Sequence, residues 1–486
     1  MHRANFSSTG IQYIIILSVL VIGSIAGLFI GSADYSKLII AGVLGVVFLI
    51  VSLTRPWIAV TLFFLLIPLE NLFVLKSGVI ATMSKLAGAY LVFLVLASGS
   101  LKYINEVFRN KKVFFILFFG VVALVSITYA KNQAQSFHFL ITLWLSIILY
   151  FVLVLLMRDL KSLQAATLAI LTGCVISIFS PLIFGIGEIL AAASGERYGG
   201  LWGDQNEFAA VQLILIPISI AQFYTSNKKS YKILYLFYSL ILLVGLVMTY
   251  SRGGFLAFAL MIVLAMFKFV SGKNRVKILA IAIPCIVIGF AVLYFTVADQ
   301  FISRMETLRI LESRESVRTE SSLDKRYYYY FELAPQIFAE NPVLGVGFRD
   351  FISHNIYKQI SHNTYLEVLT GTGLLGFIPF ITILFLTWKE LRNVGKIIAR
   401  NKDQLYIKIY ANALELGFIG FLVAGSFISL DLDKMLWLSI TLSAVLLNIL
   451  IILNTRINQP DNKYRQADER YRRQQFDFAS TRRNAP

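Results

Sequence analysis

Long apolar segments constrain this chain more than any other feature of its sequence. Most of them run for about 17 to 25 residues, the length of an α-helix that crosses the hydrocarbon core of a bilayer. Hydrophobic residues make up 57% of the chain and charged residues only 15%, which is too much apolar surface for a soluble core to bury. The segments lie near residues 11–31, 38–53, 57–75, 79–98, 113–129, 139–157, 163–190, 207–224, 232–249, 254–270, 277–298, 363–388, 411–430 and 435–454.

These segments predict an all-α, polytopic integral membrane protein with about 12–14 transmembrane helices. The lower number omits the second and third segments, because only Arg55 and Pro56 separate them. The first apolar run, Ile11 to Ile30, lacks a clear cleavage site and is predicted to be a transmembrane helix, not a signal peptide. Cys174 and Cys285 lie in apolar runs without a CxxC pattern, so the sequence indicates neither a disulfide framework nor a metal site.

Lysine and arginine are unevenly divided between the two sides of the predicted membrane. The formal net charge is +17, but in a polytopic membrane protein such an excess marks cytoplasmic loops and does not indicate a nucleic-acid partner. On the side of the N-terminus we count 29 Lys and Arg residues, against 7 on the other side when the long segment 299–361 is set aside. Both termini are therefore predicted to be cytoplasmic.

This orientation divides the chain into four parts. We expect a helical scaffold over 1–298, a large external loop over 299–361, C-terminal transmembrane helices over 362–454 and a basic cytoplasmic tail over 455–486. Within the loop, Tyr327 to Ala339 is predicted to form an interfacial helix that ends before Asn341-Pro342. The external face has no nucleotide pool, which argues against ATP or a nucleotide sugar as a direct donor.

Arginines mark two places where an apolar run begins on the predicted external face. Arg252 stands at the edge of one such segment, where a charge that enters the hydrocarbon is costly, and this makes it a candidate functional residue. An arginine that extends its charged end to the interface is the alternative interpretation. Ser251 precedes Arg252 and Gly253 follows it, and glycines at a helix N-terminus let a phosphate approach the free N–H groups.

A second arginine, Arg197, stands in the glycine-rich loop RYGGLWGDQN, where no structural reason for it is evident. Asp204 and Asn206, which follow it, are both good helix N-cap residues. Arg326 precedes four tyrosines in the long loop and also fits an ordinary solvated charge.

One histidine lies where the long loop meets a transmembrane segment. His362 can take up a proton near neutral pH, which makes it a candidate catalytic base, although a structural role fits equally well. Ser361 and Asn363 beside it are also potential helix caps, and the pair His354-Asn355 repeats the pattern eight residues earlier. Asp431-Leu432-Asp433 matches the DxD pattern of metal-dependent glycosyltransferases only over three letters, and no metal or other cofactor is predicted.

Several of these stretches resemble one protein family. SRGGFLAFALMIVLAM, the charged loop, NPVLGVGFRDF and SHNTYLEVLTGTGLLGFIPF, in this order, resemble the bacterial O-antigen ligase and O-antigen polymerase superfamily. RYGGLWGDQNEFAAVQLILIPI resembles an upstream block of the same family, so the likeness covers about Arg197 to Phe380.

The resemblance implies a GT-C-like helical fold and a location in the bacterial cytoplasmic membrane. It implies metal-independent, inverting transfer of a glycan from undecaprenyl diphosphate to an acceptor hydroxyl on the periplasmic face. It further implies that arginines hold the diphosphate and that His362 activates the acceptor. The implied site residues are Arg197, Arg252 and Arg326 for the diphosphate, His362 and Arg252 for catalysis, and Ser251, Gly253, Asn363 and Asn206 in support.

The resemblance leaves the acceptor open. An O-antigen ligase would use lipid A-core, and a polymerase would use the sugar end of another lipid-linked repeat unit. We lean slightly to the ligase-like interpretation. A flippase that binds the same diphosphate without chemistry is the alternative from another class, and it would be expected to carry charged or helix-breaking positions near the bilayer midplane.

Overall fold

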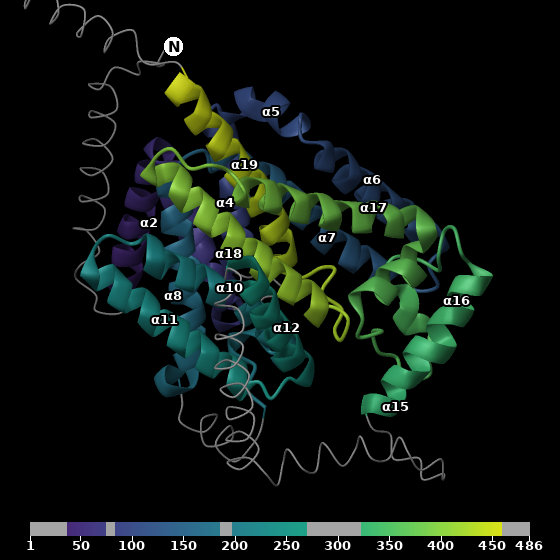
Figure 1. Ribbon diagram of the computed structural model, residues 1–486. Helices are drawn as coiled ribbons and strands as arrows, with labels where there is room; N and C mark the ends of the chain where they lie inside the picture. Colours follow the sequence, from purple (N-terminus) through teal and green to yellow (C-terminus); the bar gives the residue numbers. More distant parts are fainter. Residues whose placement is uncertain (1–35, 74–82, 185–196, 270–321, 459–486) are drawn as a thin grey trace, which may run out of the picture.

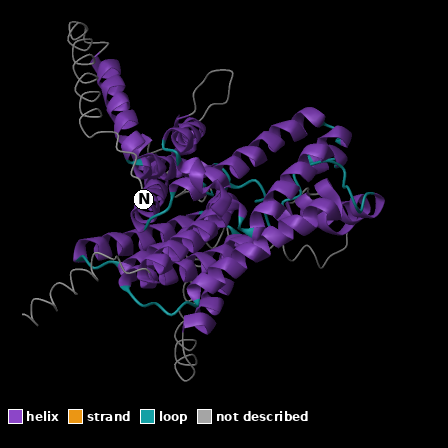
Figure 2. Ribbon diagram, turned by 90° about the horizontal axis from the view of Figure 1, so that it is seen from above, coloured by secondary structure: helices purple, strands orange, loops and turns teal. Residues whose placement is uncertain are grey.

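The computed structural model describes residues 36–73, 83–184, 197–269 and 322–458. In these residues every regular element is helical, as Figure 2 shows. Nine of the described helices are long and apolar enough to cross a membrane, or ten if one bent pair counts as a span. The prediction of an all-α, polytopic membrane protein is therefore confirmed. The predicted segments 11–31 and 277–298, Cys285 and the basic tail from residue 459 lie outside the described residues.

The helices follow the apolar segments of the sequence closely (Figure 1). The longer ones are α2 (Ser36–Thr54), α3 (Pro56–Leu66), α4 (Met83–Ala97), α6 (Lys111–Ser126), α7 (Gln133–Leu156), α8 (Leu160–Phe184), α10 (Gln205–Thr225), α11 (Lys229–Met248), α12 (Arg252–Phe269), α17 (Thr364–Gly395), α18 (Lys402–Ala424) and α19 (Lys434–Asn458). Short elements include η1 (Ile67–Phe73), α5 (Ile104–Phe108), α15 (Ser322–Tyr327), η5 (Tyr328–Leu333) and α16 (Ala334–Glu340).

Helix α10 lies inside the bundle. It packs against α18, α11 and α12, and 78% of its most apolar 18-residue stretch is buried. Its sequence is apolar all round, as expected for a helix that neighbours enclose. Because α10 is fixed in this way, the residues at its first turn are held rigidly at one end of the bundle.

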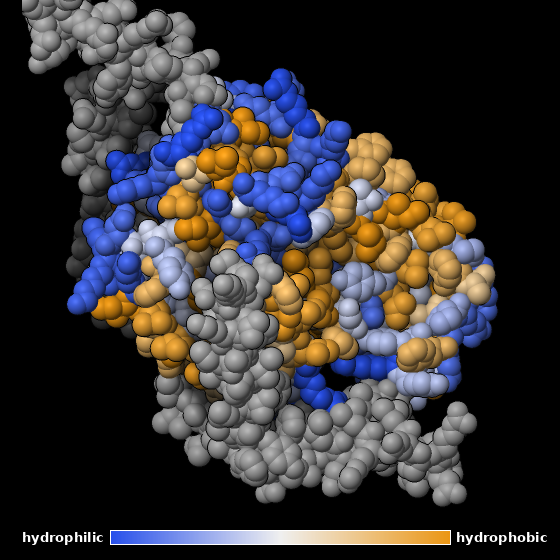
Figure 3. Space-filling model, viewed as in Figure 1, coloured by the Kyte–Doolittle hydropathy of each residue, from blue (hydrophilic) through white to orange (hydrophobic). Residues whose placement is uncertain are grey.

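The two ends of the bundle gather different connections. At one end, Lys112 at the start of α6 forms an ion pair of 2.7 Å with Glu390 of α17. At the opposite end, the Tyr198 N–H donates to the Met248 carbonyl and the Thr364 N–H donates to the Gly425 carbonyl. The connections at this second end are the ones that the charge count predicts to be external. Figure 3 shows hydrophobic residues over much of the visible side of the molecule, with hydrophilic residues gathered toward its ends.

The described part of the long loop begins with a continuous helical stretch that packs against α17. α15, η5 and α16 follow one another without a gap from Ser322 to Glu340, and η5 is a π-helical turn. The helix predicted over Tyr327 to Ala339 is therefore present and extends back to Ser322, while its interfacial position stays a prediction. It ends at Asn341, whose φ of −134° leaves the helical region, and Tyr329 packs its ring edge-on against Phe351.

Helix α17 is broken near its start, and the turn after α16 fills the break. Gly373 has φ +58° and ψ −163°, which interrupts the helical hydrogen bonds. The freed carbonyls of Thr370 and Gly371 accept hydrogen bonds of 2.9 Å from the N–H groups of Val346 and Gly347. On the other side of the break, the N–H groups of Leu374 and Leu375 donate to the Pro342 and Val343 carbonyls at 2.9 and 3.1 Å. The NPVLGVG and TGTG stretches are thus two halves of one hydrogen-bonded joint.

Replacing Gly373 by alanine should destabilise the fold. A Cβ at this position would overlap the Val343 carbonyl and would also require a left-handed backbone for alanine. We expect the free energy of unfolding to fall by roughly 2–4 kcal/mol, measured by thermal unfolding of the protein in detergent. Gly45→Ala is the matched control, because nothing lies within 4 Å of its added methyl group. Equal unfolding temperatures for the two variants would contradict this description of the joint.

Candidate functional site

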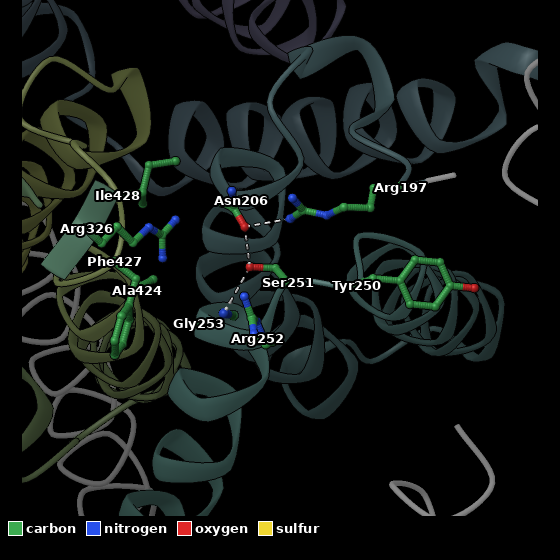
Figure 4. A pocket seen from close by; sticks show the side chains of 11 residues that line it. Arg197, Asn206, Tyr250, Ser251, Arg252, Gly253, Arg326, Ala424, Phe427 and Ile428 are labelled. Atoms are coloured by element: carbon green, nitrogen blue, oxygen red, sulfur yellow. Dashed lines mark hydrogen bonds between the residues drawn. The ribbon is translucent and has the colours of Figure 1, made fainter. Parts of the chain in front are cut away.

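Six of the eight residues singled out in the sequence line one polar pocket. The pocket has a volume of about 80 Å³ and lies at the end of the bundle where α10 and α12 begin. Figure 4 shows Arg197 and Arg326 on opposite sides of Asn206 and Ser251. The six residues are Arg197, Asn206, Ser251, Arg252, Gly253 and Arg326.

A short chain of hydrogen bonds joins three of these residues (Figure 4). The Arg197 guanidinium donates to Asn206 Oδ1 at 2.7 Å, and the Ser251 hydroxyl donates to the same oxygen at 2.9 Å. Arg197 is also anchored through Nε, which donates to the Thr249 carbonyl at 3.1 Å. Asn206 is therefore not the helix cap that its position suggests. Asp204 is the cap of α10, since its carboxylate accepts from the N–H groups of Asn206 and Glu207 at 2.7 and 3.0 Å.

The start of α12 forms one wall of the pocket. Ser251 is buried, and its hydroxyl oxygen accepts from the Gly254 N–H at 3.2 Å. Arg252 is exposed at the first position of the helix. A Cβ added to Gly253 would come within 3.0 Å of the Phe427 side chain, so the glycine allows the α18–α19 loop (residues 425–433) to approach the helix end. A helix N-terminus beside several guanidinium groups suits a bound anion.

Arg326 reaches the pocket from the described helix of the long loop. Its guanidinium makes no hydrogen bond or ion pair within the described part of the chain and points toward Asn206 and Ser251 in Figure 4. Tyr330, one helical turn later, donates to the His362 carbonyl at 2.7 Å and to the Ser426 carbonyl at 3.2 Å. The helix that carries Arg326 is thereby tied to the loop that carries His362.

His362 lies beside the pocket and does not line it. Its backbone has φ +53°, an uncommon conformation for a residue with a side chain. Burial and the neighbouring Arg326 guanidinium lower the pKa of His362 below its ordinary 6.5. Among the described residues the ring itself makes no hydrogen bond, so both ring nitrogens can serve a substrate.

The residues on either side of His362 explain how this backbone is held. Asn363 is the N-cap of α17, accepting from the N–H groups of Tyr365 and Leu366 at 2.9 and 3.1 Å. Ser361 is buried and donates to Glu367 through its N–H at 2.8 Å and its hydroxyl at 2.6 Å. Asn363 therefore supports the site as a cap and not through the pocket.

The remaining sequence candidates have structural roles. Asp431 forms a buried two-point ion pair with Arg349, at 2.9 Å to Nε and 2.8 Å to Nη2. Asp433 accepts from the Met435 N–H at 2.7 Å at the start of α19. His354 contacts the Asp350 carbonyl at 2.9 Å, and Asn355 donates to two backbone carbonyls of its own turn. The described residues contain no group of three or more His, Cys, Asp or Glu placed to hold a metal ion.

Sequence reasoning missed the residues that connect the pocket to His362. Tyr330 was one of four consecutive tyrosines, and nothing in the pattern distinguished it. Phe427 and Ile428 of the α18–α19 loop also line the pocket, and their sequence context, an apolar turn, carries no signal. Their contribution depends on the packing of α18 and α19 against α17.

One region of the chain matches a known protein family. Residues 237–381 match the family model described as O-antigen ligase. This region of the chain is therefore similar to the O-antigen ligase family. No curated protein matches the chain.

The region matched to the O-antigen ligase family contains both halves of the site. It includes Ser251, Arg252 and Arg326 of the pocket and His362 beside it. Arg197 and Asn206 lie before the matched region, and the structure brings them to the same pocket. The chain is therefore a multi-pass membrane protein with a region that matches the O-antigen ligase family, and its candidate site extends beyond that region.

Proposed function

We propose that this protein is a membrane glycosyltransferase that moves a glycan from undecaprenyl diphosphate to an acceptor hydroxyl. The observation that carries the proposal is the convergence of Arg197, Arg252 and Arg326 on one pocket beside His362. The proposed location is the bacterial cytoplasmic membrane, with both termini cytoplasmic and the site on the periplasmic face. The charge distribution of the connections supports this orientation.

The pocket suits the diphosphate of the donor. Three guanidinium groups and the N-terminus of α12 present positive charge and N–H donors to a common space. As the bond between the anomeric carbon and the diphosphate oxygen breaks, its electron pair moves onto that oxygen. Fixed positive charge stabilises the leaving group as its charge grows, which is the electrostatic contribution expected of such sites.

His362 is proposed to activate the acceptor. A neutral ring nitrogen accepts the proton of the acceptor hydroxyl while that oxygen forms the new bond to the anomeric carbon. Attack from the side opposite the diphosphate inverts the anomeric configuration, and this chemistry uses no metal or other cofactor. The lowered pKa of His362 keeps the ring neutral at physiological pH, which is the form that a base requires.

This role predicts the pH dependence of the reaction. Activity should fall as the pH drops through the pKa of His362, and burial together with Arg326 places that pKa below 6.5. Arg326→Gln removes a positive neighbour that favours the neutral ring, so the pKa of His362 should rise. The fall in activity on the acidic side of the pH profile should therefore move to higher pH. The measurement is kcat/KM against pH in proteoliposomes, with each variant scaled to its own maximum. An acidic side of the pH profile that does not shift in Arg326→Gln would count against His362 as the base.

Ligase and polymerase remain the two forms of this proposal. Both would use the same donor pocket and the same base, and they differ in the acceptor, which is lipid A-core for a ligase and a lipid-linked repeat for a polymerase. We favour the ligase, because the matched family carries that description. A flippase is the rival from another class, but the candidate charges gather at one end of the bundle.

The test is glycan profiling of a deletion strain complemented with wild type or His362→Ala at equal membrane levels. The proposal expects wild type to restore long glycans and the variant to leave lipid-linked precursor on the external face. Long accumulated chains identify a ligase, and single repeat units identify a polymerase. Precursor retained on the cytoplasmic face would instead identify a flippase and would overturn the proposed reaction.

A further inference from the structure

A second polar cavity lies on the other side of the first turn of α10. It has a volume of about 380 Å³ and holds the side chains of a typical sugar pocket, namely carboxylates, an amide and a broad indole ring. Its lining residues include Glu70, Asn71, Trp202, Glu207 and Asp433. Carboxylate oxygens accept hydrogen bonds from hydroxyl groups, and the described cavity offers three such side chains.

An apolar groove lies next to this cavity. The groove has a volume of about 360 Å³ and lies between α3, α4 and α7, with Phe63, Val92 and Leu149 in its walls. Lys85 and Lys434 line both the groove and the polar cavity, so they mark the boundary between the two. Lys434 also pairs with Glu70.

The order of chemical surfaces matches one kind of molecule. From the membrane inward, an apolar groove is followed by two lysines and then by a cavity of carboxylates and an indole. A lipid-anchored glycan presents the complementary order, because its apolar chains are followed by phosphate groups at the membrane boundary and then by further sugars. A soluble sugar would leave the groove without a purpose, and an ordinary phospholipid would leave the polar cavity without one.

The second cavity and the arginine pocket flank the same two segments. In the first turn of α10, Asn206 lines the arginine pocket while Glu207 lines the second cavity. In the α18–α19 loop, Ile428 lines the pocket while Ser429 lines the cavity. Ser429 also lies within 3.5 Å of the Ser361 hydroxyl, one residue before His362. The two sites therefore approach each other where His362 lies.

We propose that the groove and the second cavity bind the acceptor, a lipid-anchored glycan that carries phosphate where its apolar chains meet its sugars. This inference rests on the proposed glycosyltransferase function. The acceptor enters sideways from the membrane between α4 and α7, its phosphate contacts Lys85 and Lys434, and its sugars lie toward Glu207 and Asp433. The donor diphosphate occupies the arginine pocket across the first turn of α10, so the two lipids reach His362 from different sides.

The test uses purified full-length protein in proteoliposomes supplied with lipid extract from membranes of the deletion strain. Ala89→Trp fills the groove, and Lys85→Glu reverses the charge at its polar end. Leu86→Trp is the matched control, because Leu86 is exposed on the same helix and does not line the groove. Transfer is measured against the mole fraction of extract, and undecaprenyl diphosphate binding is measured separately on each variant.

We expect both groove variants to lower transfer at least tenfold at a low mole fraction of extract, while their binding of undecaprenyl diphosphate stays unchanged. The Leu86→Trp control should transfer at the wild-type rate. Lys85→Glu should recover in part at high extract, which a merely unfolded protein would not do. Wild-type transfer by both groove variants, with His362→Ala inactive, would overturn this inference and leave the proposed function intact. Loss of undecaprenyl diphosphate binding in the groove variants would assign the groove to the donor. Wild-type transfer by His362→Ala would overturn both proposals.

Discussion

His362→Ala should lower the transfer rate by about 10²- to 10⁴-fold, the usual contribution of a positioned general base. The imidazole has no hydrogen bond within the described residues, so its removal should cost little stability. The measurement is single-turnover transfer in proteoliposomes, with protein levels and unfolding temperatures matched to wild type. His354→Ala is the control, because His354 belongs to the second His-Asn pair and contacts only its own turn.

Two results would contradict this role for His362. A rate within about threefold of wild type would leave no catalytic contribution of the size expected of a general base. An equal loss in His354→Ala would show that the long loop as a whole, and not the imidazole beside Arg326, is responsible. Retention of donor binding in His362→Ala would separate a defect in chemistry from a defect in substrate binding.

Arg252→Lys should lower transfer by about 10²- to 10³-fold, the loss typical when one stabilising group is removed from a developing anion. Lysine keeps the charge but not the planar fork that holds two phosphate oxygens at once. Arg252 is exposed at the first position of α12, so the substitution should leave the fold unchanged. The measurement is kcat/KM for transfer, together with affinity for undecaprenyl diphosphate.

The matched control for this substitution is Arg400→Lys. Arg400 is exposed in the connection between α17 and α18, at the opposite end of the bundle from the pocket. We expect wild-type transfer from this variant. A similar loss in both variants would show that the assay responds to arginine content in general, and a wild-type rate in Arg252→Lys would remove this residue from the site.

Much of the fold could be predicted because hydrocarbon imposes a simple rule on the sequence. A spanning helix has to be apolar and long, and the helices found in the described residues follow the predicted segments. The short α3 and the bend after α4 were the exceptions. Met83–Ala97 and Ser100–Phe108 meet at an angle of 83°, and Gly99 between them has φ +67°. A lone glycine in a polar stretch did not reveal that bend.

The site was only partly predictable, because three of its features depend on tertiary packing. The break at Gly373 needs the partner turn at Val346 to accept and supply hydrogen bonds, and neither stretch alone indicates the joint. Asn206 has the sequence signature of a cap, yet Asp204 takes that role and frees Asn206 to hold Arg197. Arg326 fits a solvated charge in sequence, and only the docking of its helix, through Tyr330 on the His362 and Ser426 carbonyls, brings it to the pocket.

The most direct test of the central claim measures donor binding and glycan transfer separately, in variants of the arginine pocket and of His362. Undecaprenyl diphosphate binding is measured by native mass spectrometry on purified wild type, Arg252→Lys, Arg326→Gln and His362→Ala, in parallel with transfer. We predict at least tenfold weaker binding in both arginine variants and wild-type binding in His362→Ala, with slower transfer in all three. Wild-type binding by both arginine variants would contradict the claim that the arginine pocket holds the donor diphosphate.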